Sequence, residues 1–282
     1  MCNQIDNEQI PLSVIIPFHE DVTSIKDGDQ TKLEQVLSSI CRSSRSANEI
    51  ICVDDNSNGC FRSLVSKYKA LYVRTSIPQT TPHISHRAKA RQIGLNLAKN
   101  DVVLFLDADI LVTEELLEVM NESLKRHGPK AMVFVQRENL IKPCREKESD
   151  GCDNSKKFRI SIMDTYARWG NNRSEQPIWA QETSHCFAIH KDFIISVGGW
   201  DENFVGWGEE DTELFYRLWR DGGKIIKLID PKLKVKHIPH PVDHHANYLS
   251  FKRNAWYFIA KHPEVSCLRR TFYQHFGILL AD

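Results

Sequence analysis

The chain has 282 residues, of which 41% are hydrophobic and 26% are charged, which is ordinary globular composition. Lys and Arg together number 37, and Asp and Glu together number 37, so the formal net charge is zero. No overall field therefore favours nucleic acid or an anionic membrane, and any binding of phosphate must be local.

The sequence contains no recognisable targeting or membrane-spanning segment. Residues 1–6 lack the basic and apolar regions of a signal peptide, and no apolar run approaches the length of a bilayer span. We therefore expect a cytoplasmic protein that meets any membrane only peripherally, at its inner face. The eight cysteines include no Cys-x-x-Cys pair, which predicts reduced thiols, with a Cys144–Cys152 bridge as an alternative.

The first half of the chain alternates short apolar runs with helical patterns. We predict strands at 11–17, 49–53, 71–75, 102–106 and 131–135, and helices at 32–42, from 62, at 86–98 and at 114–126. Strands that alternate with helices are typical of a parallel sheet with helices on its faces. The sequence therefore predicts an α/β fold of the Rossmann-like kind, with a mostly parallel sheet flanked by helices.

Two of these strands end in acidic residues. Asp54 and Asp55 follow one strand, and Asp107 and Asp109 follow another. Because side chains alternate along a strand, Asp107 and Asp109 can address one site at the carboxyl edge of the sheet, where open α/β sheets bind ligands. Hard oxygen ligands suit Mg²⁺ or Mn²⁺ holding a phosphate. Capping of a helix or turn is the alternative for these acids.

The helix at 86–98 carries basic residues where they are not expected. Arg87, Lys89 and Arg91 lie near its start, and the helix dipole disfavours cations there. We infer either an anion nearby or a solvated basic face.

Periodicity is lost between residues 138 and 157, and a loop this long inside a domain is usually functional or disordered. We place a boundary there and predict three parts. These are a nucleotide-binding half (1–137), an acceptor-binding and catalytic half of the same domain (138–246) and a C-terminal helical extension (247–282). In the later parts we predict an amphipathic stretch at 158–169, strands at 184–190, 224–229 and 232–237, helices at 191–197 and from 210, and an amphipathic helix at 248–280 that packs on the domain or forms a homodimer.

A dense motif, Trp207-Gly208-Glu209-Glu210-Asp211, opens the helix from residue 210. Its acids could serve only as a favourable first turn. However, Trp200 and Trp207 are framed by glycines, and aromatic rings beside a carboxylate are a common way to hold a sugar. Downstream, His237 closes the strand at 232–237 on its buried face, and His240, His244 and His245 follow. A ligand role for His237 is possible there, whereas a zinc site lacks a supporting cysteine.

Four motifs in this order resemble those of the GT-A glycosyltransferases. The resemblance is to family 2 enzymes that carry the C-terminal module of β-1,4-galactosyltransferases and chondroitin-polymerase-like enzymes, and it covers about residues 12–240. The motifs lie at 13–17, 53–57, 105–109 and 198–202 with 207–211. The resemblance implies a metal-dependent, inverting transferase of polysaccharide-biosynthesis type. It would move a galactose, N-acetylgalactosamine, glucose or glucuronic acid unit from a UDP-sugar to a hydroxyl of a glycan, lipid-linked or peptide acceptor.

The resemblance also implies a role for each matching residue. The donor nucleotide would contact Pro17, Phe18, Glu20, Asp54, Asp55, Arg87, Arg91, Asp107 and Ala108. The metal, Mn²⁺ or Mg²⁺, would be held by Asp107, Asp109 and His237, with His240 as the alternative histidine. The acceptor would contact Trp207, Gly208 and Glu210, and Asp211 would be the catalytic base.

Two positions distinguish this chain from similar enzymes. Retaining enzymes that transfer N-acetylgalactosamine to peptides usually carry Asn where this chain has Asp211, so the resemblance favours inversion. Glu209 replaces a glycine of the usual motif, and its charge could narrow or recharge the acceptor pocket. Two other functions stay open. One is a nucleotidyltransferase, against which the acidic, glycine-free segment 18–21 argues, and the other is a catalytically silent sugar-binding module.

Overall fold

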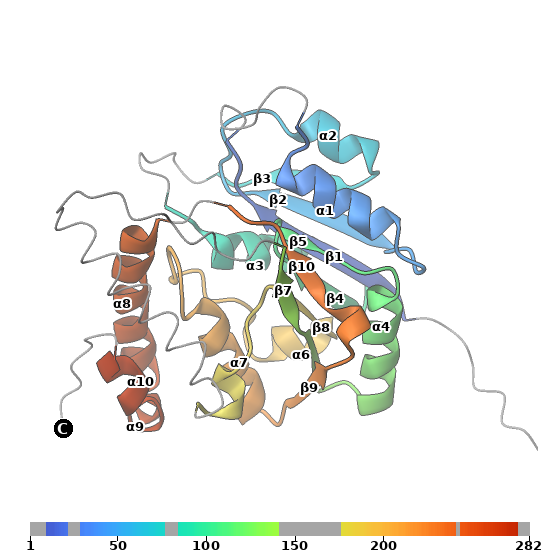
Figure 1. The fold of residues 1–282 in the computed structure, drawn as a ribbon. Coiled ribbons are helices and arrows are strands. Elements are labelled where there is room, and N and C mark those ends of the chain that lie inside the picture. Colours follow the sequence, from blue (N-terminus) through green and yellow to red (C-terminus); the bar gives the residue numbers. More distant parts are fainter. Residues whose placement is uncertain (1–9, 22–28, 77–83, 141–175, 241–242, 276–282) are drawn as a thin grey trace, which may run out of the picture.

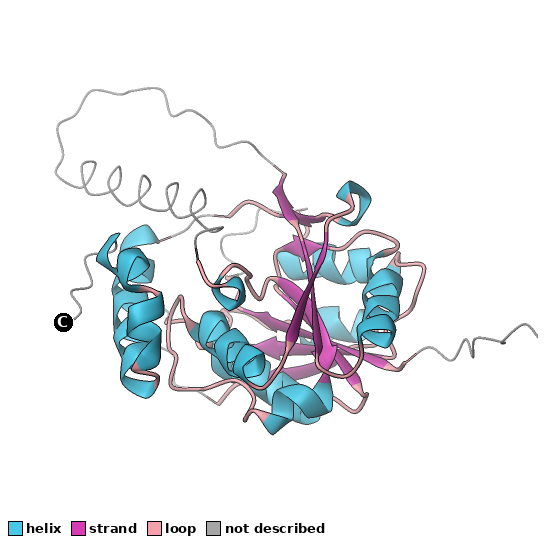
Figure 2. Cartoon of the chain, turned by 90° about the horizontal axis from the view of Figure 1, so that it is seen from below, coloured by secondary structure: helices cyan, strands magenta, loops and turns pink. Residues whose placement is uncertain are grey.

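The computed structural model describes residues 10–21, 29–76, 84–140, 176–240 and 243–275. Within these ranges, helices cover both faces of a seven-stranded sheet, and a smaller sheet crosses one edge of it (Figures 1 and 2). The predicted amphipathic stretch at 158–169 and the Cys144–Cys152 bridge lie outside the described residues. The cysteines that are described are free thiols: Cys41, Cys52, Cys60, Cys186 and Cys267.

The large sheet has the order β3-β2-β1-β4-β8-β6-β9. Its strands are β1 (Leu12–Phe18), β2 (Glu49–Asp54), β3 (Leu71–Arg74), β4 (Val102–Leu106), β6 (Ala131–Val135), β8 (Cys186–His190) and β9 (Lys224–Leu228). Strand β8 runs antiparallel between β4 and β6, and the other pairs are parallel. The predicted α/β fold with a mostly parallel sheet is confirmed.

Alternate residues of the buried strands pack into two separate cores, one on each face of the sheet. Val14 and Ile16 of β1 face one core, together with the apolar sides of α1 (Lys32–Cys41), α2 (Arg62–Lys67) and α4 (Leu116–His127). Ile15 faces the other core, which is covered by α3 (Arg87–Leu97), α6 (Lys191–Ser196), α7 (Glu210–Arg220) and α8 (His244–Lys261). A sheet buried on both faces explains why its strands are continuous apolar runs.

A three-stranded sheet joins segments that are far apart in the sequence. It consists of β5 (Ile110–Leu111), β10 (Val235–His237) and β7 (Arg137–Asn139), with β10 in the middle. The predicted strand at 232–237 is wrong in its first half, where Pro231–Leu233 form a 3₁₀ turn. Asp230 caps that turn by accepting a hydrogen bond from the Lys232 amide at 2.9 Å, and Pro231 has no amide hydrogen for a strand ladder.

The single helix predicted at 248–280 is also wrong. The described residues form α8, then α9 (Glu264–Leu268) and α10 (Arg270–His275). Pro263 accounts for the break, because proline cannot continue the hydrogen bonding of a helix. Helix α8 buries Phe251 and Phe258 against the core that contains α7. Among the described residues, no helix has the length and apolar character that crossing a bilayer requires.

Candidate active site

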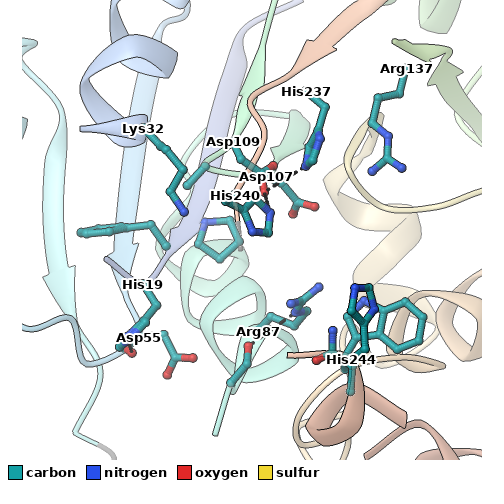
Figure 3. Close-up of a pocket in the computed structure, with 16 residues that line it drawn as sticks. His19, Lys32, Asp55, Arg87, Asp107, Asp109, Arg137, His237, His240 and His244 are labelled. Atoms are coloured by element: carbon teal, nitrogen blue, oxygen red, sulfur yellow. Dashed lines mark hydrogen bonds and ion pairs between the residues drawn. The ribbon is translucent and has the colours of Figure 1, made fainter. Parts of the chain in front are cut away.

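A cavity of about 570 Å³ opens at the carboxyl ends of β1, β2 and β4 (Figure 3). This is the edge where open α/β sheets bind ligands, and the volume suits a small organic ligand. The cavity is lined by Pro17, Phe18, His19, Lys32, Asp55, Ser85, Arg87, Asp107, Ala108, Asp109, Arg137, Trp207, His237, His240, His244 and Asn247.

The cavity gathers many of the predicted site residues and leaves others beside it. The predicted residues that line it are Pro17, Phe18, Asp55, Arg87, Asp107, Ala108, Asp109, Trp207 and His237. The predicted residues that do not line it are Glu20, Asp54, Arg91, Gly208, Glu210 and Asp211. His240, the alternative histidine, also lines the cavity, as does His244 of the histidine cluster noted in the sequence. Sequence reasoning gave no role to His19, Lys32, Ser85, Arg137 and Asn247.

The small sheet builds a group of possible metal ligands on the cavity wall. Antiparallel pairing places His237 opposite Ile110, directly after Asp109. The Nε2 atom of His240 lies 2.9 Å from the Asp109 carboxylate, and that of His237 lies 3.6 Å from it. One ligand atom from each of Asp109, His237 and His240 lies within 4.8 Å of the others. One carboxylate and two imidazoles form a donor set that suits a divalent transition metal such as Mn²⁺.

The two histidines keep the Asp109 carboxylate in its charged form, and a metal would replace the protons that they share with it. Burial alone would raise the pKa of Asp109, but hydrogen bonds from His237 and His240 outweigh burial and hold its pKa well below the ordinary range. The carboxylate is therefore ionised at neutral pH. Lys32, Arg87 and Arg137 line the same cavity (Figure 3), so an anionic ligand would also meet positive charge.

Arg91 lies beside the cavity and joins its two sides. It is 1% exposed, and its guanidinium contacts Asp107 at 2.7 Å and Glu210 at 3.2 Å. The same group lies over the ring of Trp200, 4.8 Å from the centroid. Trp200 is itself only 3% exposed, so it is a core residue and not an exposed surface for a sugar. Burial opposes the charge on Arg91, but the two carboxylates outweigh it and raise its pKa. Asp107 therefore lines the cavity while its carboxylate is paired with the buried Arg91.

Two of the predicted acids have structural partners. Asp54 is fully buried and accepts hydrogen bonds from the Ser57 amide at 2.7 Å and the Tyr72 hydroxyl at 2.6 Å. Glu20 is also buried and accepts a hydrogen bond from the Leu33 amide at the start of α1. Burial raises the pKa of Glu20, and that hydrogen bond opposes the rise. Neither acid caps the helix near residue 62 as the sequence alternative had it, because α2 has Phe61 at its N-cap and no side-chain cap there; Asp54 instead closes the turn after β2, and Glu20 contacts the start of α1.

Asp55 does reach the cavity, and its neighbours fix its orientation. Its carboxylate accepts a hydrogen bond from the His86 amide at 2.6 Å. Its carbonyl oxygen accepts one from the His19 ring at 2.9 Å. Asp55 follows β2, so its place at the sheet edge comes directly from the end of that strand. A carboxylate held in this way can accept a hydrogen bond from a ring N–H of a bound base.

The motif at 207–211 enters the site from the other side. Trp207 lines the cavity, while Glu209 and Glu210 are buried and Asp211 is half-buried. Burial, followed by the adjacent Asp211, raises the pKa of Glu210, whereas Arg87 and Arg91 oppose that rise. The Asp211 carboxylate accepts weak hydrogen bonds from the Ser184 amide at 3.2 Å and hydroxyl at 3.4 Å.

A sheet of this order with a ligand cavity at its carboxyl edge is the GT-A glycosyltransferase architecture. The structure superposes on a crystal structure of GalNAc-T7 with UDP, GalNAc and Mn²⁺ with a TM-score of 0.61 and 18% identity, over 90% of this chain and 48% of that chain. The family model described as glycosyltransferase like family 2 matches residues 13–271. The chain belongs to this family.

Curated relatives give a similar result at the sequence level. Polypeptide N-acetylgalactosaminyltransferase 3 of Drosophila melanogaster is 31% identical over 80% of this chain and 34% of its own length. Probable N-acetylgalactosaminyltransferase 7 of Caenorhabditis elegans is 27% identical over 86% of this chain and 40% of its own length. The chain therefore spans between about a third and two fifths of the length of these relatives.

Proposed function

We propose that this chain is a metal-dependent, inverting glycosyltransferase that moves a sugar from a UDP-sugar to an acceptor hydroxyl. One observation carries the proposal. A single cavity brings together the Asp109–His237–His240 group, Asp55 and Trp207, which come from distant parts of the chain. Such a cavity can hold a nucleotide, its phosphates and a sugar at once.

The donor side would use the first part of the chain. Asp55 would accept a hydrogen bond from the uracil ring, and Pro17 and Phe18 would line the nucleoside pocket. Lys32, Arg87 and Arg137 would face the phosphates. Asp109, His237 and His240 would hold Mn²⁺ or Mg²⁺, whose positive charge would stabilise the leaving diphosphate. Asp107 adds a carboxylate beside this group, although Arg91 already contacts it.

The acceptor side would use the motif at 207–211. Trp207 would stack on a sugar ring, with Gly208 and Glu210 behind it. Asp211 would take the proton of the acceptor hydroxyl. The hydroxyl oxygen bonds to the anomeric carbon as the bond from that carbon to UDP breaks. A base on the face opposite the leaving group inverts the configuration. Asp211 must leave its weak contacts with Ser184 to do so.

The names of the relatives suggest where to begin with substrates. Both are N-acetylgalactosaminyltransferases, so UDP-N-acetylgalactosamine is the first donor to test, and a peptide joins a glycan and a lipid-linked sugar as acceptor candidates. We also retain the division into a donor half (1–137), an acceptor half (138–246) and a C-terminal extension as a proposal. The cytoplasmic location and the homodimer stay predictions from the sequence.

The test measures UDP release from a panel of UDP-sugars with Mn²⁺ and with EDTA. We expect one donor to be consumed slowly, and we expect EDTA and Asp109→Ala to abolish this. Asp211→Asn should still bind UDP but lose turnover, whereas the exposed Asp221→Asn should behave as wild type. Binding of no UDP-sugar, with or without metal, would contradict the donor assignment. Release of pyrophosphate from a nucleoside triphosphate and sugar phosphate would favour the nucleotidyltransferase, and sugar binding without turnover would favour the silent module.

Two histidine variants identify the metal ligands. His237→Ala and His240→Ala should each weaken Mn²⁺ binding, measured by titration in the absence of donor, because both imidazoles face Asp109. Unchanged Mn²⁺ affinity in His240→Ala would leave His237 as the histidine ligand. The anomeric configuration of the product, read by NMR, decides between inversion and retention.

A further inference from the structure

Glu209 occupies a backbone conformation that glycine adopts more easily. Its φ is +68°, in the left-handed region, and Gly206 and Gly208 nearby are also left-handed at +83° and +97°. A side chain in this region is strained, because its Cβ lies too close to the following carbonyl oxygen. The glutamate side chain therefore needs contacts that offset this strain.

Those contacts are buried and lead away from the cavity. Glu209 is 3% exposed and Arg269 is 2% exposed, and the two form an ion pair at 2.5 Å. The Tyr273 hydroxyl lies 3.5 Å from the same carboxylate oxygen, and the Arg269 guanidinium lies 4.9 Å from the centre of the Tyr273 ring. The carboxylate thus points to the junction of α9 and α10. It does not line the cavity, so its charge does not enter a pocket formed by the lining residues.

The same residue sets the beginning of α7. The carbonyl oxygen of Glu209 accepts the hydrogen bond of the Glu213 amide at 2.9 Å, which is the first turn of the helix. Glu210 and Asp211 follow directly and are the first two residues of α7. Any rotation of the Glu209 backbone would therefore turn both side chains.

The loop before Glu209 is fixed on the C-terminal helices as well. The Trp207 amide donates to the Ser250 hydroxyl at 2.9 Å, and Asn254 donates to the Gly208 carbonyl at 2.8 Å. These contacts come from α8, whereas Arg269 comes from the end of α9. The ion pair is thus a second, separate attachment, two positions before the proposed base.

We propose that Glu209 is a positioning residue which, through Arg269, fixes the start of α7 and aims Asp211 at the reacting sugar. The C-terminal helices then belong to the catalytic unit. This inference rests on the proposed function, in which Asp211 is the base. It also explains why a glutamate can replace the glycine of the usual motif without entering the acceptor pocket.

Glu209→Gly tests this directly, because glycine removes the carboxylate and keeps the left-handed backbone. We measure UDP release with water as the acceptor, Mn²⁺–UDP affinity, and amide hydrogen exchange of residues 207–213. We expect kcat to fall about 10- to 100-fold, since small misplacements of catalytic groups have effects of this size. Exchange should accelerate, while Mn²⁺–UDP affinity stays within about twofold of wild type because the donor side is untouched.

Matched variants separate positioning from simple destabilisation. Lys69→Gly also places glycine at a left-handed residue, with φ +54°, but Lys69 does not line the cavity, so kcat should be unchanged. Arg220→Met removes an exposed cation that pairs with Glu264 between α7 and α9, and should also leave it unchanged. The double variant Glu209→Gly/Arg269→Met removes both buried charges and should lose no more kcat than Glu209→Gly alone.

Wild-type kcat together with wild-type exchange in Glu209→Gly would overturn the inference. Arg269→Met is also measured alone. If the fold-loss of kcat in the double variant equals the fold-loss in Glu209→Gly multiplied by that in Arg269→Met, the two residues act independently and the inference is likewise overturned. If wild type releases no UDP from any donor, the proposed function fails. The exchange of residues 207–213 then still decides whether Glu209 fixes the start of α7.

Discussion

Arg91→Met should be among the most destabilising single substitutions at this site. The change leaves Glu210, which is 4% exposed, as a buried carboxylate that has lost its 3.2 Å contact with the guanidinium. It also removes the contact with Asp107 and the cation over the Trp200 ring. Breaking one side of a buried ion pair typically costs about 3–5 kcal/mol. The Asp107 side chain is 27% exposed and can recover water, so we assign most of this loss to Glu210.

Urea unfolding followed by tryptophan fluorescence measures this loss by linear extrapolation. Arg87→Met is the matched control. Arg87 lies 3.9 Å from the same Glu210 carboxylate and is 34% exposed, and in this variant Glu210 keeps its pair with Arg91, so we expect a loss of only about 0–1 kcal/mol. The double variant Arg91→Met/Glu210→Gln removes the unpaired charge and should recover part of the stability. A loss below about 1 kcal/mol in Arg91→Met, or equal losses in the two arginine variants, would refute the reasoning.

Two further predictions concern stability away from the cavity. Gly206→Ala should lower the free energy of unfolding by about 2 kcal/mol or more, because its φ is +83° and its Cβ would lie 2.4 Å from Ser250. Gly128→Ala, with φ +86° but open space around its Cβ, should lower it by about 1 kcal/mol. Equal losses in thermal unfolding would contradict this. Asp201 is half-buried beside Lys261, 2.6 Å away, and its pKa is lowered from 3.8 to about 2 although partial burial opposes this. The unfolded chain therefore binds more protons than the folded protein between these values, so the stability that Asp201 contributes is present above pH 4 and is lost as the pH falls towards 2. Asp201→Asn should flatten this part of the pH–stability curve by on the order of 1 kcal/mol, and parallel curves for the variant and wild type would contradict the assignment.

Local patterns predicted the parts of the site that follow strand ends. Asp55, Asp107 and Asp109 come directly after β2 and β4, so the direction of each strand carries them to the carboxyl edge. The partners of Asp109 were harder to predict, because β10 pairs with β5 across more than 120 positions of the chain. Hydrophobic alternation marks a strand, but it does not say which distant strand is its neighbour.

The burial of Arg91 could have been predicted from helical periodicity, but its charge favoured a different interpretation. Its position near the start of α3 suggested contact with an anionic ligand, and the structure places it against two carboxylates of the protein itself. Ala88, Arg91 and Leu95 have helical spacing and share the buried face of α3. The periodicity of the helix therefore indicated that Arg91 is buried, although its two carboxylate partners depend on the tertiary fold.

The two partners of Arg91 come from the two sides of the proposed reaction. Asp107 follows β4 beside the possible metal ligands, and Glu210 begins α7 beside the proposed base. Separating these segments would leave a buried charge on at least one of them, at a cost of several kcal/mol. The guanidinium of Arg91 thus links the segment after β4 to the start of α7, while Arg269 pairs with the neighbouring residue, Glu209. Asp211 directly follows these two paired residues in the first turn of α7, so both buried ion pairs restrict the segment that carries it.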